Sequence, residues 1–212
     1  MSNGRPGLDN LENQFFRDSM KALDLIANRK SDSGFVICMR RLLGNNPQKG
    51  KSFRIAKREH VYAGVDKSRV IFLPAQWREE FDKTKSAWAG CENWWAGYPF
   101  ILWVEIRLGD DGTTGYLKLI AEIGPISNYK VRKGIIDTIR AAASAKNLER
   151  IQFPADAADK GRLYSRFFTK NSITVNDIRD PDEMERKFMQ LVADFEAEFD
   201  LIASAIPQLL EL

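Results

Sequence analysis

Alternating hydrophobic and polar positions predict a β-hairpin near the middle of the chain. Residues 100–108 and 115–123 both alternate, and the sequence Gly109-Asp-Asp-Gly112 between them is typical of a tight turn. Because successive side chains of a strand point to opposite faces, one face of the hairpin should carry aliphatic side chains. The opposite face should carry Trp103, Glu105, Arg107, Lys118 and Glu122.

Hydrophobic residues spaced three and four apart predict amphipathic helices near both ends of the chain. Residues 8–27 show this spacing, and residues 180–210 continue it along one narrow stripe. The sequence Asp180-Pro181 is a typical helix start, with proline in the first turn. Further helices are expected at about residues 75–88 and 129–147.

The remaining apolar segments predict strands. Residues 35–43 fit either a strand or a buried helical turn, and a strand is favoured; residues 53–62 and 69–73 are expected to be strands. Short extended segments are expected at residues 151–153 and 163–175. The pattern therefore predicts an α+β fold in a single domain, residues 1–212. Its mainly antiparallel sheet would have about five or six strands, packed by the N-terminal helix and the long C-terminal helix.

Composition narrows the class of protein. Of 212 residues, 44% are hydrophobic and 29% charged, and the mean hydropathy is −0.36, as in soluble globular proteins. No apolar run reaches the roughly 18 residues that span a bilayer, and the first residues lack a hydrophobic signal core, so no membrane partner and a cytoplasmic location are expected. Two cysteines and one histidine do not suffice for a structural zinc site. No metal site and no cofactor are predicted.

Charge is divided between two segments. Residues 29–69 contain eleven basic residues against three acidic ones, a balance of +8. Residues 180–212 contain nine acidic residues against two basic ones, a balance of −7, although the whole chain has a net charge of only +3. The basic segment would suit a phosphate backbone, and the acidic helix would suit solvent or a basic protein partner.

The basic segment also predicts which side chains lie together. If residues 53–62 form one strand, Arg54, Arg58 and His60 share one face, and Lys57 lies on the other. Four more basic residues lie nearby in the sequence: Arg40, Arg41, Lys49 and Lys51. This set is typical of a surface that follows phosphates, and the alternative is a solvated face with no partner.

Aromatic residues are concentrated in residues 88–100, which contain three of the five tryptophans, Trp88, Trp94 and Trp95. Such a segment provides a stacking platform for bases or a protein interaction surface. The alternative is a loop whose aromatic side chains fold back over the edge of a sheet.

Carboxylates on the predicted hairpin raise the question of catalysis. Glu105, Lys118 and Glu122 share a face and would supply ligands for Mg²⁺, but an ordinary solvent-facing sheet has the same composition, and that interpretation is favoured. The letters "PD" and "ExK" in residues 181–187 fall at one helix start, whereas nucleases place them on successive strands around a metal. No serine or cysteine can be assigned to His60, so a nucleophilic triad is not predicted.

Several short motifs resemble one known group of proteins. They are Trp94-Trp95-Ala-Gly-Tyr-Pro-Phe100, Leu102-Trp-Val-Glu-Ile106, Leu119-Ile-Ala-Glu-Ile-Gly-Pro125 with the following Arg132, and the acidic last helix. Over about residues 60–212 the chain resembles the C-terminal region of bacterial PD-(D/E)XK-superfamily proteins linked to restriction and defence. The resemblance implies association with nucleic acid or with a bacterial or phage defence system. It transfers no catalytic residue, because the nuclease half is not recognisable.

Three functional hypotheses follow. The leading one is a non-catalytic nucleic-acid-associated or regulatory binding protein. Its contact residues would be Arg40, Arg41, Lys49, Lys51, Arg54, Arg58, His60, Trp94 and Trp95. The first alternative is a metal-dependent nuclease that uses Glu105, Lys118, Glu122 and Mg²⁺, and the second is a protein–protein adaptor that uses the acidic C-terminal helix. Whether the protein is an enzyme stays open, with a binding role favoured.

Overall fold

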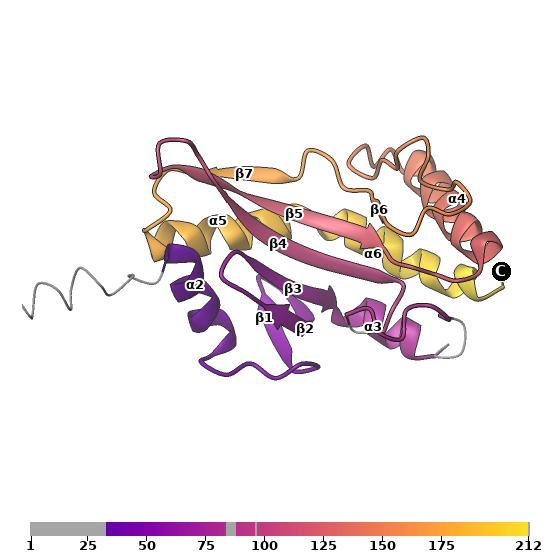
Figure 1. Cartoon of the computed structure of the whole chain (residues 1–212), viewed down its shortest axis with the longest axis horizontal. Coiled ribbons are helices and arrows are strands. Elements are labelled where there is room, and N and C mark those ends of the chain that lie inside the picture. The colour runs from indigo at the N-terminus through magenta and orange to yellow at the C-terminus, as the bar shows by residue number, and fades with distance from the viewer. Residues whose placement is uncertain (1–32, 84–87, 96, 212) are drawn as a thin grey trace, which may run out of the picture. The chain divides into compact units, whose positions relative to one another are not determined.

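The computed structural model describes residues 33–83, 88–95 and 97–211, which belong to one compact unit (Figure 1). The helix expected at residues 8–27 lies outside the described residues, as does its packing against the C-terminal helix. No described helix is both long enough and apolar enough to cross a membrane.

The described residues form an α+β fold around a seven-stranded sheet in which every pairing is antiparallel. The strands are β1 Ser52–Ile55, β2 Arg58–Val65, β3 Arg69–Pro74, β4 Phe100–Leu108, β5 Gly115–Ile123, β6 Ser165–Arg166 and β7 Ser172–Val175. The first five are neighbours in chain order, and β6 and β7 both pair with β5. The predicted fold class is therefore confirmed, with one strand more than expected.

In the described part of the chain, five helices and one 3-10 helix accompany the sheet. They are α2 Gly34–Leu43, α3 Ala75–Asp82, α4 Tyr129–Ala145, α5 Pro181–Ala193, α6 Glu196–Ala205 and η1 Ile206–Glu211. Figure 1 shows α5 and α6 following one another behind β4 and β5. At the start of α5, the Asp180 carboxylate accepts hydrogen bonds from the backbone N–H groups of Asp182 and Glu183, as its sequence predicted.

The predicted long C-terminal helix is interrupted. Its first part ends at Ala193 and its second begins at Glu196, so the expectation of one helix over residues 180–210 was wrong. Arg150 lies over the Phe195 ring, 4.2 Å from its centroid, and donates a hydrogen bond to the backbone carbonyl of Asp194. A guanidinium thus satisfies a carbonyl that the interruption leaves without its helical partner. The apolar stripe continues through the interruption, because Phe195 and Phe199 are both buried.

Residues 35–43 form a helix instead of the favoured strand. The Ser33 hydroxyl accepts a hydrogen bond from the Val36 N–H and caps α2. Phe35, Cys38 and Met39 are buried at helical spacing. A short apolar run fits both the two-residue period of a strand and the 3.6-residue period of a helix, and tertiary packing selects between the two structures.

The single strand expected over residues 53–62 is two strands. Ala56 and Lys57 form a two-residue turn between β1 and β2, and Ala56 has a φ of 51°. Arg54 pairs with Glu59, whereas Arg58 pairs with Ile55. Adjacent register positions point to opposite faces, so the prediction that Arg54 and Arg58 share a face was wrong.

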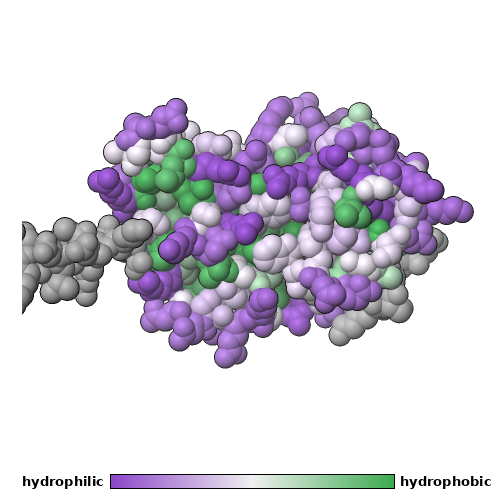
Figure 2. All heavy atoms as spheres, in the orientation of Figure 1, coloured by the Kyte–Doolittle hydropathy of each residue, from purple (hydrophilic) through white to green (hydrophobic). Residues whose placement is uncertain are grey.

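The two faces of the sheet have different neighbours. Aliphatic and aromatic side chains of one face, including Leu102 and Leu119, form the main core with buried residues of α5 and α6. The other face, here called the open face, has a small cluster with Trp94 packed against it: Ala63, Ile71, Ile101, Trp103 and Ile120. Figure 2 looks onto this side and shows hydrophilic side chains over most of it, with smaller hydrophobic areas between them.

Candidate nucleic-acid interface

Arg58, one of the predicted phosphate ligands, is held by the acidic C-terminal helix. Its Nε donates to Glu196 Oε2 and its Nη2 to Asp200 Oδ1, both at 2.6 Å. The guanidinium also lies 5.8 Å from the centroid of the Phe199 ring, and the Arg58 side chain is only 15% exposed. Arg58 therefore neutralises acids of its own chain and connects β2 to α6.

Two further arginines pair with carboxylates of α5 and α6. Arg41 Nη1 on α2 lies 2.6 Å from Asp182 Oδ1 and 3.5 Å from Glu185 Oε2. Arg150 forms two hydrogen bonds of 2.8 Å with the buried Glu198 carboxylate. Arg41 and Arg58 of the basic segment, together with Arg150 outside it, thus pair with the acidic segment within the fold. Use of the acidic helix by a basic protein partner stays a prediction, with fewer unpaired carboxylates than the sequence count implied.

His60 lies in the core and not on the surface. Its ring contacts Phe53, Phe72 and Phe199 at centroid distances of 5.1 to 6.2 Å, and none of the side chain is exposed. Burial lowers the pKa of His60 to about 4, because the charged imidazolium loses its hydration. Nδ1 lies 3.1 Å from the Arg58 carbonyl, and Nε2 has no hydrogen-bond partner among the described residues. We therefore assign His60 a packing role as a neutral side chain.

The remaining predicted cations divide between two places. Lys49, Lys51 and Arg54 are exposed on and before β1, the edge strand of the sheet. Arg54 is in register with Glu59 and lies on the open face. Arg40 is exposed on α2.

The open face has a hollow of about 290 Å³ between β2, β3, α3 and the aromatic segment, here called the Trp95 pocket. Val61, Ala63 and Leu73 supply apolar lining from β2 and β3. The remaining lining contains aromatic and basic side chains: Lys49, Tyr62, Arg78, Trp95 and Tyr98. The volume is close to the lower end of small-molecule sites, about 300 Å³. The structure thus brings the predicted residues Lys49 and Trp95 together.

The tryptophans of the aromatic segment have different environments. Trp88 is buried against Phe81, and Trp94 packs so closely on Gly124 that a β-carbon at that glycine would lie 2.3 Å from the indole. Trp95, in contrast, is 41% exposed. Two tryptophans therefore anchor the segment to the fold, and Trp95 is available to a ligand.

The backbone at Trp95 is unusual. Its φ of 46° lies in the left-handed region, which bulky side chains rarely adopt. Such a conformation costs about 1–3 kcal/mol and is concentrated at functional sites. The indole stands above Gly64, and the Arg69 guanidinium lies 5.8 Å from the ring centroid.

The candidate catalytic residues lie on the open face, as their alternation predicted, and Glu105 and Lys118 are directly opposite one another. Each of the two carboxylates accepts a hydrogen bond from an arginine: Glu105 from Arg107 at 2.8 Å, and Glu122 from Arg166 at 3.2 Å. Burial raises the pKa of Glu122, and Arg166 opposes that shift. Within the described part of the chain, no group of three histidine, cysteine or acidic side chains is arranged to hold a metal.

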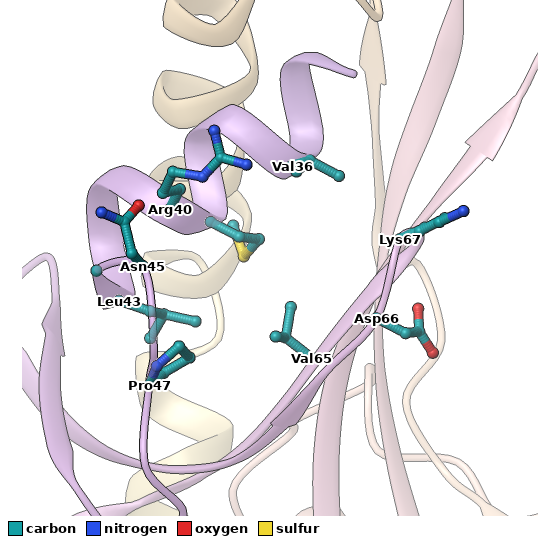
Figure 3. Close-up of a pocket in the computed structure, with 10 residues that line it drawn as sticks. Val36, Arg40, Leu43, Asn45, Pro47, Val65, Asp66 and Lys67 are labelled. Carbon is teal, nitrogen blue, oxygen red and sulfur yellow. The ribbon is translucent and has the colours of Figure 1, made fainter. Parts of the chain in front are cut away.

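A second hollow of similar volume, also about 290 Å³, lies between α2 and the turn that joins β2 to β3 (Figure 3). Val36, Leu43 and Val65 line its interior, and Lys67 points away from it. Arg40 contributes from α2. The lining of this hollow also contains Asn45, Asp66 and Lys67 but no aromatic side chain, whereas the Trp95 pocket has three aromatic residues in its lining.

Sequence reasoning missed three side chains around the Trp95 pocket. Nothing in the sequence distinguishes Arg69 from the other basic residues of segment 29–69, or Tyr98 from the other aromatic residues of segment 88–100. Arg78 lies on α3 and had no distinguishing signal, because its place beside Lys49 depends on how α3 packs against β2.

Comparison of the chain with protein-family models, with curated proteins and with solved structures found no match.

Proposed function

We propose that this protein binds nucleic acid without catalysing a reaction, and that the open face around the Trp95 pocket is its contact surface. The observation that carries the proposal is the exposed indole of Trp95 beside Lys49, which has no ion pair within the described residues. Arg69 and Arg78 also lie near the indole, but they pair with Asp66 and Asp82 of their own chain. Indoles stack on bases, and lysine and arginine neutralise phosphates, so the combination fits a polynucleotide better than an apolar ligand.

The charge that remains at the sheet edge supports the same proposal. Lys49, Lys51 and Arg54 are exposed and have no ion pair within the described residues, unlike Arg41 and Arg58. A strand of phosphates that passes along β1 would meet these three cations, of which Lys49 also lines the Trp95 pocket. The cytoplasmic location, the defence setting and the resemblance to PD-(D/E)XK-superfamily proteins stay predictions.

The proposal is tested by the salt dependence of binding. Fluorescence anisotropy with labelled oligonucleotides would be measured for the wild type and for a Lys49→Ala/Arg54→Ala variant over a series of salt concentrations. Each phosphate contact contributes close to one to the slope of log K against log salt, so the variant should bind more weakly with a slope smaller by about two.

A matched control removes two cations elsewhere. Lys130 and Lys146 are exposed at the two ends of α4, and their replacement by alanine changes the net charge by the same amount. This variant should keep the wild-type slope. Equal losses in both variants, or no binding by the wild type at low salt, would overturn the proposal. Strand cleavage in the presence of Mg²⁺ would instead favour the nuclease alternative.

A further inference from the structure

The Trp95 pocket has the features of a site for one flat aromatic group. Val61 and Leu73 supply apolar surface from the two strands, and Trp95 and Tyr98 add aromatic rings. A flat ring placed there would lose water from both faces and gain contacts with apolar and aromatic atoms.

The aromatic side of the pocket is held in place by the core. Tyr98 stacks on Phe81, with ring centroids 5.5 Å apart and an angle of 21° between the planes. Its hydroxyl donates a 2.7 Å hydrogen bond to Asp82. Burial raises the pKa of Tyr98, so the hydroxyl stays protonated near neutral pH. Tyr98 is therefore positioned before a ligand arrives, which lowers the entropy cost of binding.

The two cations that line the pocket, Arg78 and Lys49, differ in how firmly their own chain holds them. Arg78 donates to the Gly50 carbonyl at 3.1 Å and lies 3.6 Å from Asp82, which fixes its guanidinium and offsets its charge. Lys49 is exposed, one residue before Gly50, and has no ion pair among the described residues. A negative group next to the bound ring would therefore meet the Lys49 ammonium first.

An apolar and aromatic pocket with an unpaired cation beside it matches a nucleobase and the phosphate that follows it. In a duplex each base is stacked and paired, so only phosphates and groove edges would reach this face, and the pocket would stay unfilled. A pocket of about 290 Å³ also has no room for a stacked run of base pairs.

We infer that the Trp95 pocket receives one unpaired base of a single-stranded nucleic acid, with an adjoining phosphate on Lys49. The inference rests on the proposed function and specifies its ligand. Trp95 stacks on the base or on its neighbour. The Arg69 guanidinium lies 5.8 Å from the centroid of the indole ring. The strained backbone at residue 95 serves to present the indole to the strand.

The experiment compares a labelled single-stranded oligonucleotide of about 12 nucleotides, within the usual range of site sizes, with the duplex of the same length. The wild type should bind the single strand more tightly. Trp95→Ala should weaken single-strand binding by about 5- to 150-fold, which corresponds to one lost base stack of about 1–3 kcal/mol. Trp95→Phe should recover most of the affinity, and duplex binding should change little in either variant.

A change in the ligand keeps the test independent of protein folding. A single strand with abasic sugars retains its phosphates and lacks bases, so it should bind the wild type at least about fivefold more weakly. The Trp95→Ala variant should bind the abasic strand and the normal strand with the same affinity. Tyr129→Ala, an exposed aromatic residue at the start of α4 that does not line the pocket, is the matched control and should retain single-strand affinity.

The outcomes separate the two proposals. Equal affinity for single strand and duplex, with no loss in Trp95→Ala, would overturn the single-strand inference and leave nucleic-acid binding in place. The single-strand inference would also be overturned if the Trp95→Ala variant still bound the normal strand more tightly than the abasic strand, by the same factor as the wild type. Absence of binding to every oligonucleotide at low salt would overturn the proposed function itself.

Discussion

Arg58 and Asp200, 142 positions apart in the sequence, are joined by a 2.6 Å hydrogen bond between Nη2 and Oδ1. Glu196 accepts from the same guanidinium, so one arginine of β2 meets two acids of α6. Opposite charges that are separated along the chain are therefore adjacent in the fold. Part of the basic segment stabilises the protein, and only the remainder is available to a ligand.

Replacement of Arg58 by alanine should lower the free energy of unfolding by about 1–2 kcal/mol. Its partners Glu196 and Asp200 are partly exposed, while its own side chain is largely buried. We therefore expect a contribution to stability between that of an exposed ion pair and that of a buried one. Urea denaturation measures the change. Arg54→Ala, on the opposite face, should cost less than about 0.5 kcal/mol. Equal losses for the two variants would contradict this assignment.

His60 should make the protein less stable as the pH falls below about 6.5. Its pKa of about 4 in the fold is below the ordinary value of 6.5, so below 6.5 the unfolded chain binds a proton that the folded chain does not. The stability present above pH 6.5 is lost progressively toward pH 4. Arg58 is the charged group that contributes to this shift.

The measurement compares wild type with His60→Phe in urea at pH 7 and pH 5. The wild type should lose about 1–2 kcal/mol more than the variant over this interval, since the variant has no imidazole to protonate. Carboxylates titrate equally in both proteins and cancel in the difference. Parallel stability curves for the two proteins would show that His60 is not buried as a neutral side chain.

Gly124 should not tolerate alanine. The added β-carbon would lie 2.3 Å from the Trp94 ring, so the indole must move away from β5. We expect a loss of about 1–3 kcal/mol, as for other overpacked sites, and a change in tryptophan fluorescence and near-ultraviolet circular dichroism. Gly64→Ala is the control, because its β-carbon would make ordinary contacts of 3.6 and 3.8 Å. A wild-type spectrum for Gly124→Ala would contradict the packing of Trp94.

Cys38 and Cys91 should react slowly with a thiol reagent in the folded protein. Both are buried, and burial raises the pKa of each thiol to about 12, which leaves little of the reactive thiolate near neutral pH. With Ellman's reagent, both should react at least about a hundredfold more slowly than glutathione. Two thiols per chain should react at once in urea. A fast reaction of either cysteine in the native protein would place it at the surface.

Local patterns in the sequence determined several elements. Alternation and the Asp-Gly turn predicted β4 and β5 and correctly placed Glu105 and Lys118 on the same face of the hairpin, because side-chain direction in a strand depends only on position. The Asp180-Pro181 start of α5 was also predicted, since capping uses only neighbouring residues. Of the candidate site, the sequence indicated Lys49 and Trp95 as ligand contacts.

Tertiary structure alone decided the rest. The turn at Ala56 and Lys57 lacks the glycine or asparagine that usually marks a hairpin, so the reversal that separates Arg54 from Arg58 has no local signature. The pairing of Arg58 with α6 and the approach of Arg78 to Lys49 depend on packing between elements far apart in the chain. A charge count treats every ionised side chain as available to a partner. The fold decides which of them it neutralises, because opposite charges brought together by packing satisfy each other before any ligand arrives.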